Sequence, residues 1–124
     1  MKQFERQLIS DLYAEYKRIK DANTELGIFE QRLTICKRIA SLPAPRFYIS
    51  VHYLERIIKE MSMGYYRAKC NRFRKHHELY KRWLSLPDEK KNKEGLIEII
   101  NQPAPSYYVG ADRINRLLYK YIKL

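Results

Sequence analysis

The sequence predicts an all-α fold, a single domain of about six helices, and two observations support this class. Apolar residues recur at every third or fourth position along most of the 124 residues, which is the period of an amphipathic helix. No stretch of useful length alternates apolar and polar residues, so we expect no strands. A chain of this length builds one hydrophobic core more readily than two.

The amino-terminal half is expected to hold three helices, over residues 4–19, 26–39 and 51–61, each marked by apolar residues three and four apart. In the other half, Gly64 breaks or bends the chain before a long fourth helix that Pro87 stops. A fifth helix is expected over 88–101 and a sixth from Gly110 onward. The fourth helix is expected to turn its apolar positions inward, namely Tyr66, Cys70, Phe73, His77, Tyr80 and Leu84.

An internal repeat joins the two halves. The segment 43–50, PAPRFYIS, matches 103–110, PAPSYYVG, at an offset of 60 residues, and the match continues into the flanking helices. The sequence is therefore a pseudo-duplication of a helix, Pro-rich loop, helix unit, covering about 11–63 and 77–124. Two copies indicate a pair and not a solenoid.

Each repeated loop carries the signals that end one helix and begin the next. The prolines disfavour helical geometry in the preceding residue and lack an N–H, so each preceding helix ends near Leu42 or Gln102. Ser50 is a good N-cap for the next helix, and Gly110 takes its place in the second copy. We expect the helices to bury a core formed by Leu33, Ile39, Phe47, Leu54, Ile57, Phe73, Ile99, Leu117 and Leu118.

The charge of the chain points to a polyanionic partner. The net charge is +11 and the pI is about 9.7, with +3 in residues 1–62 and +8 in residues 63–124. Seven cations on the expected fourth helix oppose one acid, Glu78, giving +6 over sixteen residues. These candidate phosphate-binding residues are Arg67, Lys69, Arg72, Arg74, Lys75, Lys81 and Arg82. The alternative is a solvated helix face that keeps the protein soluble.

A second basic stripe lies on the sixth helix. Arg113, Arg116, Lys120 and Lys123 step by three, four and three residues, opposite apolar residues such as Leu118. Phosphate contact, an acidic protein partner and simple solvation are all consistent with this stripe. Its apolar area is too small for firm membrane binding, so we expect no membrane partner.

The repeated loops are rich in aromatic residues beside a cation. Arg46, Tyr48 and Tyr108 are candidate loop contacts, since single-stranded nucleic acids stack bases on exposed rings. Inward packing of these rings as anchors of the loop is the stronger alternative. A helix-turn-helix would read bases from the helices after the loops, but each loop is longer than the usual turn.

Catalysis finds little support in the sequence. His76 and His77 are adjacent, which separates them by about 100° on a helix, and no nucleophile, metal-binding or phosphate-loop motif is present. Cys36 and Cys70 lack partners at metal-ligand spacing, so we expect reduced thiols. We therefore expect no enzyme activity, no metal and no cofactor. The amino terminus lacks the apolar run of a secretory signal, which predicts a cytoplasmic protein, in a host cell or inside a virion.

The PAPRFYIS and PAPSYYVG loops, each followed by an amphipathic helix, resemble those of small uncharacterised all-helical proteins of gut bacteria, their phages and mobile elements. The resemblance covers about half of the chain and implies no established activity. Ser106 and Gly110 replace Arg46 and Ser50 in the second copy, so a role of Arg46 need not be shared.

These observations lead to one functional hypothesis and one rival. The hypothesis is a small basic nucleic-acid-binding protein that contacts phosphates through a basic helix, with DNA favoured over RNA. The rival is a structural or interaction protein, such as a virion component or an adaptor, whose aromatic loops or helix stripe form a subunit interface or a homo-oligomer.

Overall fold

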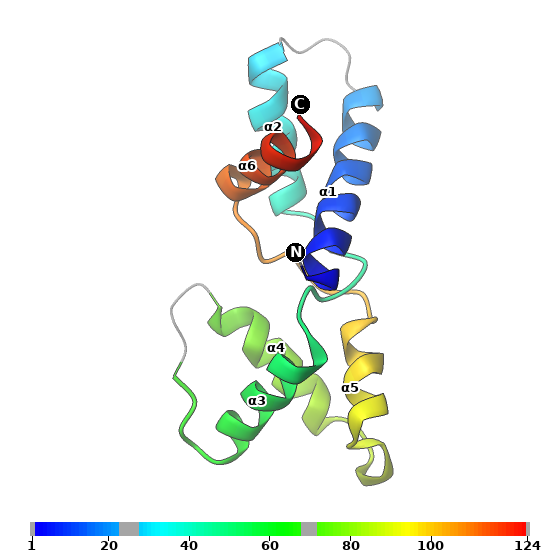
Figure 1. Ribbon diagram of the computed structural model, residues 1–124, viewed down its shortest axis with the longest axis vertical. Coiled ribbons are helices and arrows are strands. Elements are labelled where there is room, and N and C mark those ends of the chain that lie inside the picture. Colours follow the sequence, from blue (N-terminus) through cyan, green and yellow to red (C-terminus); the bar gives the residue numbers. More distant parts are fainter. Residues whose placement is uncertain (1, 23–27, 68–71, 124) are drawn as a thin grey trace. The chain divides into compact units, whose positions relative to one another are not determined.

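The computed structural model describes residues 2–22, 28–67 and 72–123, and it confirms the all-α class (Figure 1). Within these ranges the structure contains no strand, and two residues form an isolated bridge. The elements are α1 (Gln3–Ala22), α2 (Ile28–Ala40), α3 (Val51–Ser62), α4 (Phe73–Leu84), a short 3-10 turn η1 (Asp88–Lys90), α5 (Lys93–Ile100) and α6 (Ala111–Ile122).

The helices form two compact units that cut across the sequence repeats. One unit consists of residues 1–44 and 104–124 and contains α1, α2 and α6. The other consists of residues 45–103 and contains α3, α4 and α5. Each unit thus takes two helices from one repeat and the third helix from the other. The repeats over 11–63 and 77–124 exchange their last helices, a feature that the sequence analysis did not predict.

The α1–α2–α6 unit is held together by the apolar face of α6. This helix packs on both α1 and α2. Its Ile114 and Leu118 are fully buried, as are Leu12 of α1 and Ile35 and Ile39 of α2. Burial of each such side chain contributes about 1.5–3 kcal/mol, so the exchanged helix supplies a large part of this core.

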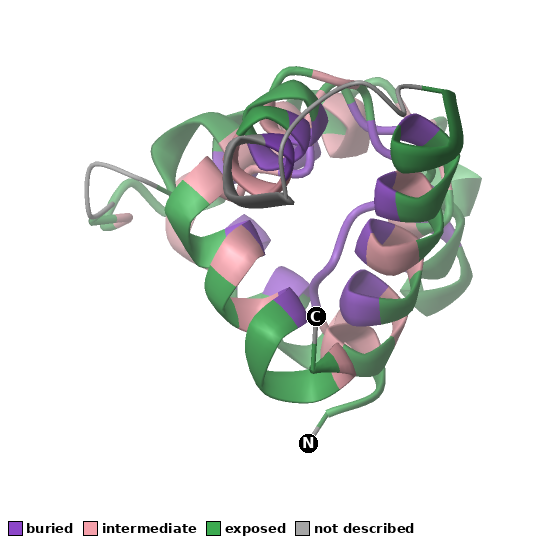
Figure 2. Cartoon of the chain, turned by 90° about the horizontal axis from the view of Figure 1, so that it is seen from above, coloured by how far each residue is buried: buried purple, intermediate pink, exposed green. Residues whose placement is uncertain are grey.

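The α3–α4–α5 unit has the same organisation. Here α3 is the exchanged helix, and it packs on both α4 and α5. Leu54 and Ile57 of α3 are buried with Leu79 of α4 and with Leu96 and Ile99 of α5. Figure 2 shows the corresponding pattern, in which buried residues recur along one side of the helices while the other side is exposed.

The two Pro-Ala-Pro loops are paired by reciprocal hydrogen bonds between equivalent residues. The Ala44 N–H donates to the Ala104 carbonyl at 2.9 Å, and the Ala104 N–H donates to the Ala44 carbonyl at 2.9 Å. Ala44 and Ala104 are 60 residues apart, which is the offset of the repeat. Both alanines are buried. The bridge therefore joins equivalent positions of the two repeats.

Buried aromatic residues hold each loop in the unit that follows it. In the α3–α4–α5 unit, the Phe47 N–H donates to the Ile100 carbonyl at 2.9 Å, and the Arg82 guanidinium lies 4.8 Å from the Phe47 ring centroid. In the other unit, the buried Tyr107 takes the place of Phe47 in the repeat, and it interacts electrostatically with Arg18 of α1. Burial raises the pKa of Tyr107 to about 12, with the carboxylates Glu15 and Asp11 nearby.

The caps follow the sequence prediction for α3 and α6. The Ser50 hydroxyl accepts a hydrogen bond from the Tyr53 N–H at 3.2 Å, and Gly110 occupies the N-cap position of α6 in extended geometry. The expected helix over 88–101 is shorter than predicted, because Asn92 caps α5 by accepting from the Gly95 N–H. A Cβ atom at Gly95 would lie 2.0 Å from the Lys90 carbonyl oxygen, so only glycine fits there.

The prediction for the fourth helix was wrong in its start and in its buried face. Gly64 adopts a φ of +80°, residues 65–67 are not helical, and α4 begins at Phe73. Lys69 and Cys70 lie outside the described residues. The buried residues of α4 are His76 and Leu79, whereas Phe73 is 48% exposed. Of the other expected core residues, Leu33 and Leu117 are half-buried and the remaining six are buried.

The exchange of helices makes a prediction about a cut chain. A protease site inserted between Gly64 and Tyr65 divides the chain into its two repeats. After cleavage, α3 stays packed on α4 and α5, and α6 stays packed on α1 and α2. We expect the nicked protein to elute from size exclusion as one species in native buffer and as two fragments in urea. Separation in native buffer would show that each repeat folds alone.

Candidate nucleic-acid interface

The solvent-facing side of α4 combines rings and cations. At about 100° per residue, Phe73, His77, Lys81 and Arg74 fall within roughly 100° of the helix circumference, on the side away from Leu79. All four are exposed. Arg74 and Lys81 form no ion pair with any carboxylate of the described residues. This side of α4, together with the exposed Arg72 that precedes it, is the α4 face.

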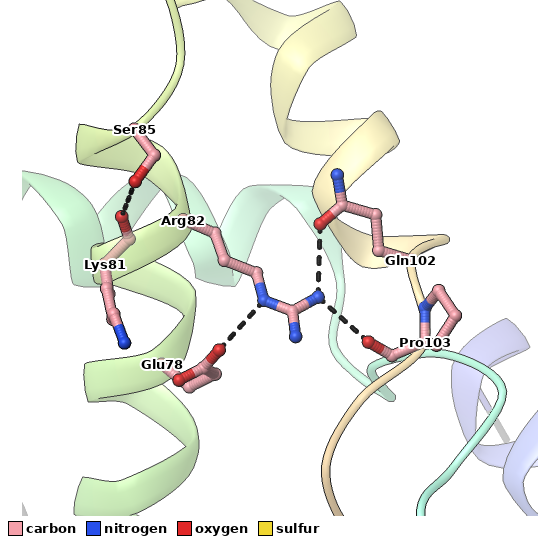
Figure 3. Close-up of polar contacts among 6 residues, drawn as sticks. All are labelled: Glu78, Lys81, Arg82, Ser85, Gln102 and Pro103. Carbon is pink, nitrogen blue, oxygen red and sulfur yellow. Dashed lines mark hydrogen bonds and ion pairs between the residues drawn. The ribbon is translucent and has the colours of Figure 1, made fainter.

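Arg82 points away from the α4 face and binds inside its own unit (Figure 3). Its Nε donates to Glu78 Oε1 at 3.0 Å, and its Nη1 donates to Gln102 Oε1 at 3.1 Å and to the Pro103 carbonyl at 2.9 Å. The Phe47 ring lies beneath this guanidinium. Arg82 therefore links α4 to the segment that begins the unit and to the segment that ends it. Its Nε and Nη1 donors are engaged within the fold, so we leave Arg82 out of the α4 face.

Lys75 is also turned inward. Its Nζ donates to the Tyr48 carbonyl at 2.6 Å, and the side chain is half-buried. The sequence placed Lys75 and Arg82 on one basic ridge because charge alone was counted. Each cation instead donates to a backbone carbonyl of one of the repeated loops. These carbonyls lie outside the helices and so have no helical N–H as a partner. The cations that remain exposed in this region are Arg67, Arg72, Arg74 and Lys81.

His76 anchors the underside of α4. It is 4% exposed, its Nδ1 lies 2.5 Å from the Tyr66 hydroxyl, and the Tyr53 and Tyr66 rings meet it edge-on at 5.8 and 5.7 Å. Burial lowers the pKa of His76 to about 4, and the cations Lys75 and Arg72 act in the same direction. The imidazole is therefore neutral at physiological pH and serves packing.

The α6 stripe is exposed as the sequence predicted. Arg113, Arg116 and Lys120 all face solvent, opposite the buried Ile114 and Leu118. They fall within about 60° of the circumference of α6. Neither Arg113 nor Arg116 forms an ion pair with a carboxylate of the described chain, and Lys120 lies 5.2 Å from the Tyr121 ring. These three cations are the α6 face.

Beside the α6 face, Asn115 and Tyr119 of α6 contact Arg32 of α2. Arg32 donates from Nη2 to Asn115 Oδ1 at 3.1 Å, and its guanidinium lies 5.6 Å from the Tyr119 ring. Tyr119 is 62% exposed. The aromatic ring thus covers one cation while leaving its other side open to solvent.

The exchange of helices spreads the positive charge evenly over the two units. The α1–α2–α6 unit carries 12 basic and 7 acidic residues, a net +5, and the α3–α4–α5 unit carries 13 and 7, a net +6. The sequence halves had suggested +3 and +8, because α6 was counted with its own repeat. Each unit therefore has one basic helix face, on α4 in one case and on α6 in the other.

The repeated loops turn two of their aromatic rings inward. Tyr48 is 4% exposed and Tyr107 is buried, which leaves neither ring accessible to a base. Arg46 and Tyr108 are half-buried. Tyr108 adopts a φ of +58°, and its N–H donates to the Ser106 hydroxyl at 2.9 Å, so Ser106 stabilises the second loop locally. The inward packing of these rings agrees with the structural alternative. The exposed ring pair lies elsewhere, on the α4 face.

The helix packing gives no support to a helix-turn-helix. Such a motif packs its two helices against each other across a short turn. Here α2 and α3, which flank the first loop, belong to different compact units, as do α5 and α6. On α3, the helix that would read bases in the first repeat, His52, Arg56 and Lys59 are exposed, and Arg56 pairs with Glu60 at 3.3 Å.

Other site chemistry is sparse over the described ranges. Within residues 2–22, 28–67 and 72–123 no group of three His, Cys, Asp or Glu side chains is arranged to hold a metal ion. Cys36 is fully buried, and burial raises the pKa of its thiol to about 11, which makes it a poor nucleophile. A membrane-crossing helix would have to be longer and more apolar than any found in the described part of the chain.

Comparison with known proteins leaves the geometry as the source of inference. No family model matches the chain, and no curated protein or solved structure is significantly similar to it.

His76 makes the stability of the fold sensitive to acid. Its folded-state pKa of about 4 lies below the ordinary 6.5, so the unfolded chain binds a proton first as the pH falls. We expect the free energy of unfolding to be unaffected by this group above pH 6.5 and to decrease by up to about 3 kcal/mol between pH 6.5 and 4. Urea unfolding of His76→Gln across this range should show the decrease removed.

The neighbouring histidine provides the matched control. His77 is exposed, so His77→Gln should keep the acid sensitivity of the wild type. If His76→Gln and wild type lose stability in parallel below pH 6.5, the buried imidazole is not the source of the pH dependence.

Lys81 and Arg82 should separate binding from stability although they are adjacent. Arg82→Ala removes three hydrogen bonds and a cation–π contact, and we expect it to lower the free energy of unfolding by about 2–3 kcal/mol. Lys81→Ala removes an exposed side chain and should change it by less than about 0.5 kcal/mol. Thermal melts of both variants measure this. Equal melting temperatures would contradict the assignment of Arg82 to a structural role and of Lys81 to the exposed face.

Proposed function

We propose that this protein binds nucleic acid through phosphate contacts from its exposed cations. The observation that carries the proposal is that both basic faces consist of exposed cations without carboxylate partners in the described structure. These cations are Arg72, Arg74 and Lys81 on the α4 face and Arg113, Arg116 and Lys120 on the α6 face. By contrast, Arg18, Arg56 and Arg82 are paired with glutamates of their own helices.

Spacing along each helix suits a phosphate backbone. Arg74 and Lys81 are separated by seven residues, as are Arg113 and Lys120, which corresponds to about 10 Å along a helix. Consecutive phosphates of one strand rise by about 3.4 Å, so each face spans about three nucleotides. The like charges within a face repel one another until a polyanion neutralises them. Release of counterions from that polyanion then favours binding.

A protein partner is the second candidate, and a separate observation favours it. Phe73 and Leu84 are 48% and 56% exposed on α4. Exposed apolar side chains of this size are typical of interaction surfaces when they form a patch. A contact of this kind would resist salt, whereas phosphate binding weakens with salt.

Salt dependence tests the phosphate contacts. Affinity for a DNA duplex should fall with salt by a log–log slope of about 0.9 per phosphate contacted. The triple variant Arg72→Glu, Arg74→Glu, Lys81→Glu should flatten the slope by about 2.7 units if all three bind phosphates. Fluorescence anisotropy with a labelled duplex, measured between 50 and 300 mM salt, supplies the slopes.

A second triple variant controls for net charge. Lys20, Lys90 and Lys93 are exposed and lie outside both faces, and their reversal lowers the net charge of the chain by the same amount. We expect this control to change the slope by less than half as much. An equal effect would show a diffuse charge interaction without a defined site, and no measurable binding by wild type to a duplex or to single-stranded oligonucleotides would reject the proposed function.

A further inference from the structure

Phe73 and His77 form an exposed ring pair that the fold does not use. The ring centroids are 5.5 Å apart with an interplanar angle of 31°, and both residues belong to α4. Phe73 is 48% exposed, although phenylalanine is among the residues most often buried. The buried side of α4 is instead formed by His76 and Leu79. Packing within the described unit therefore does not explain why an aromatic residue stands at position 73.

Most other rings of this unit are committed to internal contacts. Tyr53 and Tyr66 meet His76, and Phe47 lies beneath the Arg82 guanidinium. Tyr48 is buried. The Phe73–His77 pair differs from these because both of its residues are exposed and cations flank it.

Cations stand beside the ring pair on the same side of α4. Lys81 follows His77 by one helical turn, and Arg74 directly follows Phe73 in the sequence. Neither cation has a carboxylate partner in the described chain. Glu78, the acid nearest in sequence, is bonded to Arg82 at 3.0 Å. The arrangement is thus a pair of exposed rings, tilted by 31° to each other, with two positive charges beside it.

We propose that the Phe73–His77 pair is a base-stacking platform, and that the α4 face therefore binds single-stranded nucleic acid in preference to a duplex. The proposal rests on the proposed function and specifies the partner of the same face. In a duplex, both faces of a base are covered by neighbouring bases, so exposed rings find nothing to stack on. An unpaired base offers a free face to the rings while its flanking phosphates reach Arg74 and Lys81.

A protein partner fits this face less well. A stable protein interface buries about 800 Å² on each partner, and its centre is depleted of charged residues. The α4 face offers the two apolar side chains Phe73 and Leu84, which lie about 16 Å apart along the helix, and Arg74 and Lys81 lie to one side of them around the helix. An exposed ring beside cations is the pattern that sequence-tolerant binding of single strands uses. The shared chemistry of the ligand is an unpaired base joined to phosphodiesters, in DNA or RNA.

Substitution of Phe73 tests the platform on the full chain. The probes are dT20, rU20 and a 20-base-pair DNA duplex, each measured by anisotropy over a range of salt. For Phe73→Ala we expect affinity for dT20 to fall by about 5- to 150-fold, which corresponds to the loss of one stacked base. The salt slope should not change, because stacking releases no counterions. Affinity for the duplex should change by less than about twofold.

Two further variants keep the result interpretable. Phe73→Trp retains a stacking surface and should restore affinity for dT20. Leu84→Ala removes an equally exposed apolar side chain of α4 and should have little effect. Melting temperatures of all three variants should match the wild type, since none of these side chains is buried. Equal behaviour of rU20 and dT20 would show that the platform does not distinguish the sugars, and a difference would identify the preferred strand.

The outcomes separate this inference from the function on which it rests. Duplex binding with a steep salt slope, and no effect of Phe73→Ala on dT20, would leave the phosphate contacts standing and overturn the platform. Equal losses on duplex and single strand would also overturn it. Absence of binding to all three probes would reject both proposals. Salt-resistant self-association that Phe73→Ala abolishes would assign the ring pair to a protein contact instead.

Discussion

The structure depends on the reciprocal pairing of its two Pro-Ala-Pro loops. Prolines end α2 and α5 and keep the following chain extended, and the Ala44 and Ala104 backbones then bond to each other. The segments that follow the two loops enter different compact units, where α3 or α6 completes a three-helix core. The same geometry therefore decides where both basic faces are placed, since α6 reaches the α1–α2 pair only through the second loop.

Two cations reinforce this crossing in the α3–α4–α5 unit. Arg82 binds the Pro103 carbonyl and covers Phe47, and Lys75 binds the Tyr48 carbonyl. These cations thus satisfy loop carbonyls that lie outside the helices. Cations outside this role, on the α4 and α6 faces, retain their charge for a partner. The division between structural and free cations is the physical basis of the proposed binding surface.

Local features were predictable from the sequence, and features that depend on distant segments were not. The Ser50 cap, the proline stops and the exposed α6 stripe follow from neighbouring residues alone, and all three are found. The exchange of α3 and α6 was not predictable, because both repeats carry equivalent apolar faces and either pairing would bury them. The buried side of α4 was misassigned because His76 pairs with Tyr66 and Arg82 with Pro103, contacts that apolar spacing does not encode. Apolar spacing and charge alone therefore predicted that Phe73 is buried and that Lys75 and Arg82 belong to the candidate phosphate-binding site.

The exchange of third helices is the central claim, and methyl NOE spectroscopy of the isotopically labelled protein tests it most directly. Ile114 and Leu118 of α6 should give cross-peaks to methyl groups of α1 and α2, such as those of Leu12 and Ile35. Leu54 and Ile57 of α3 should give cross-peaks to Leu79, Leu96 and Ile99. Cross-peaks from Ile114 and Leu118 to Leu96 and Ile99 in their place would show that each repeat closes on itself, and would contradict the account.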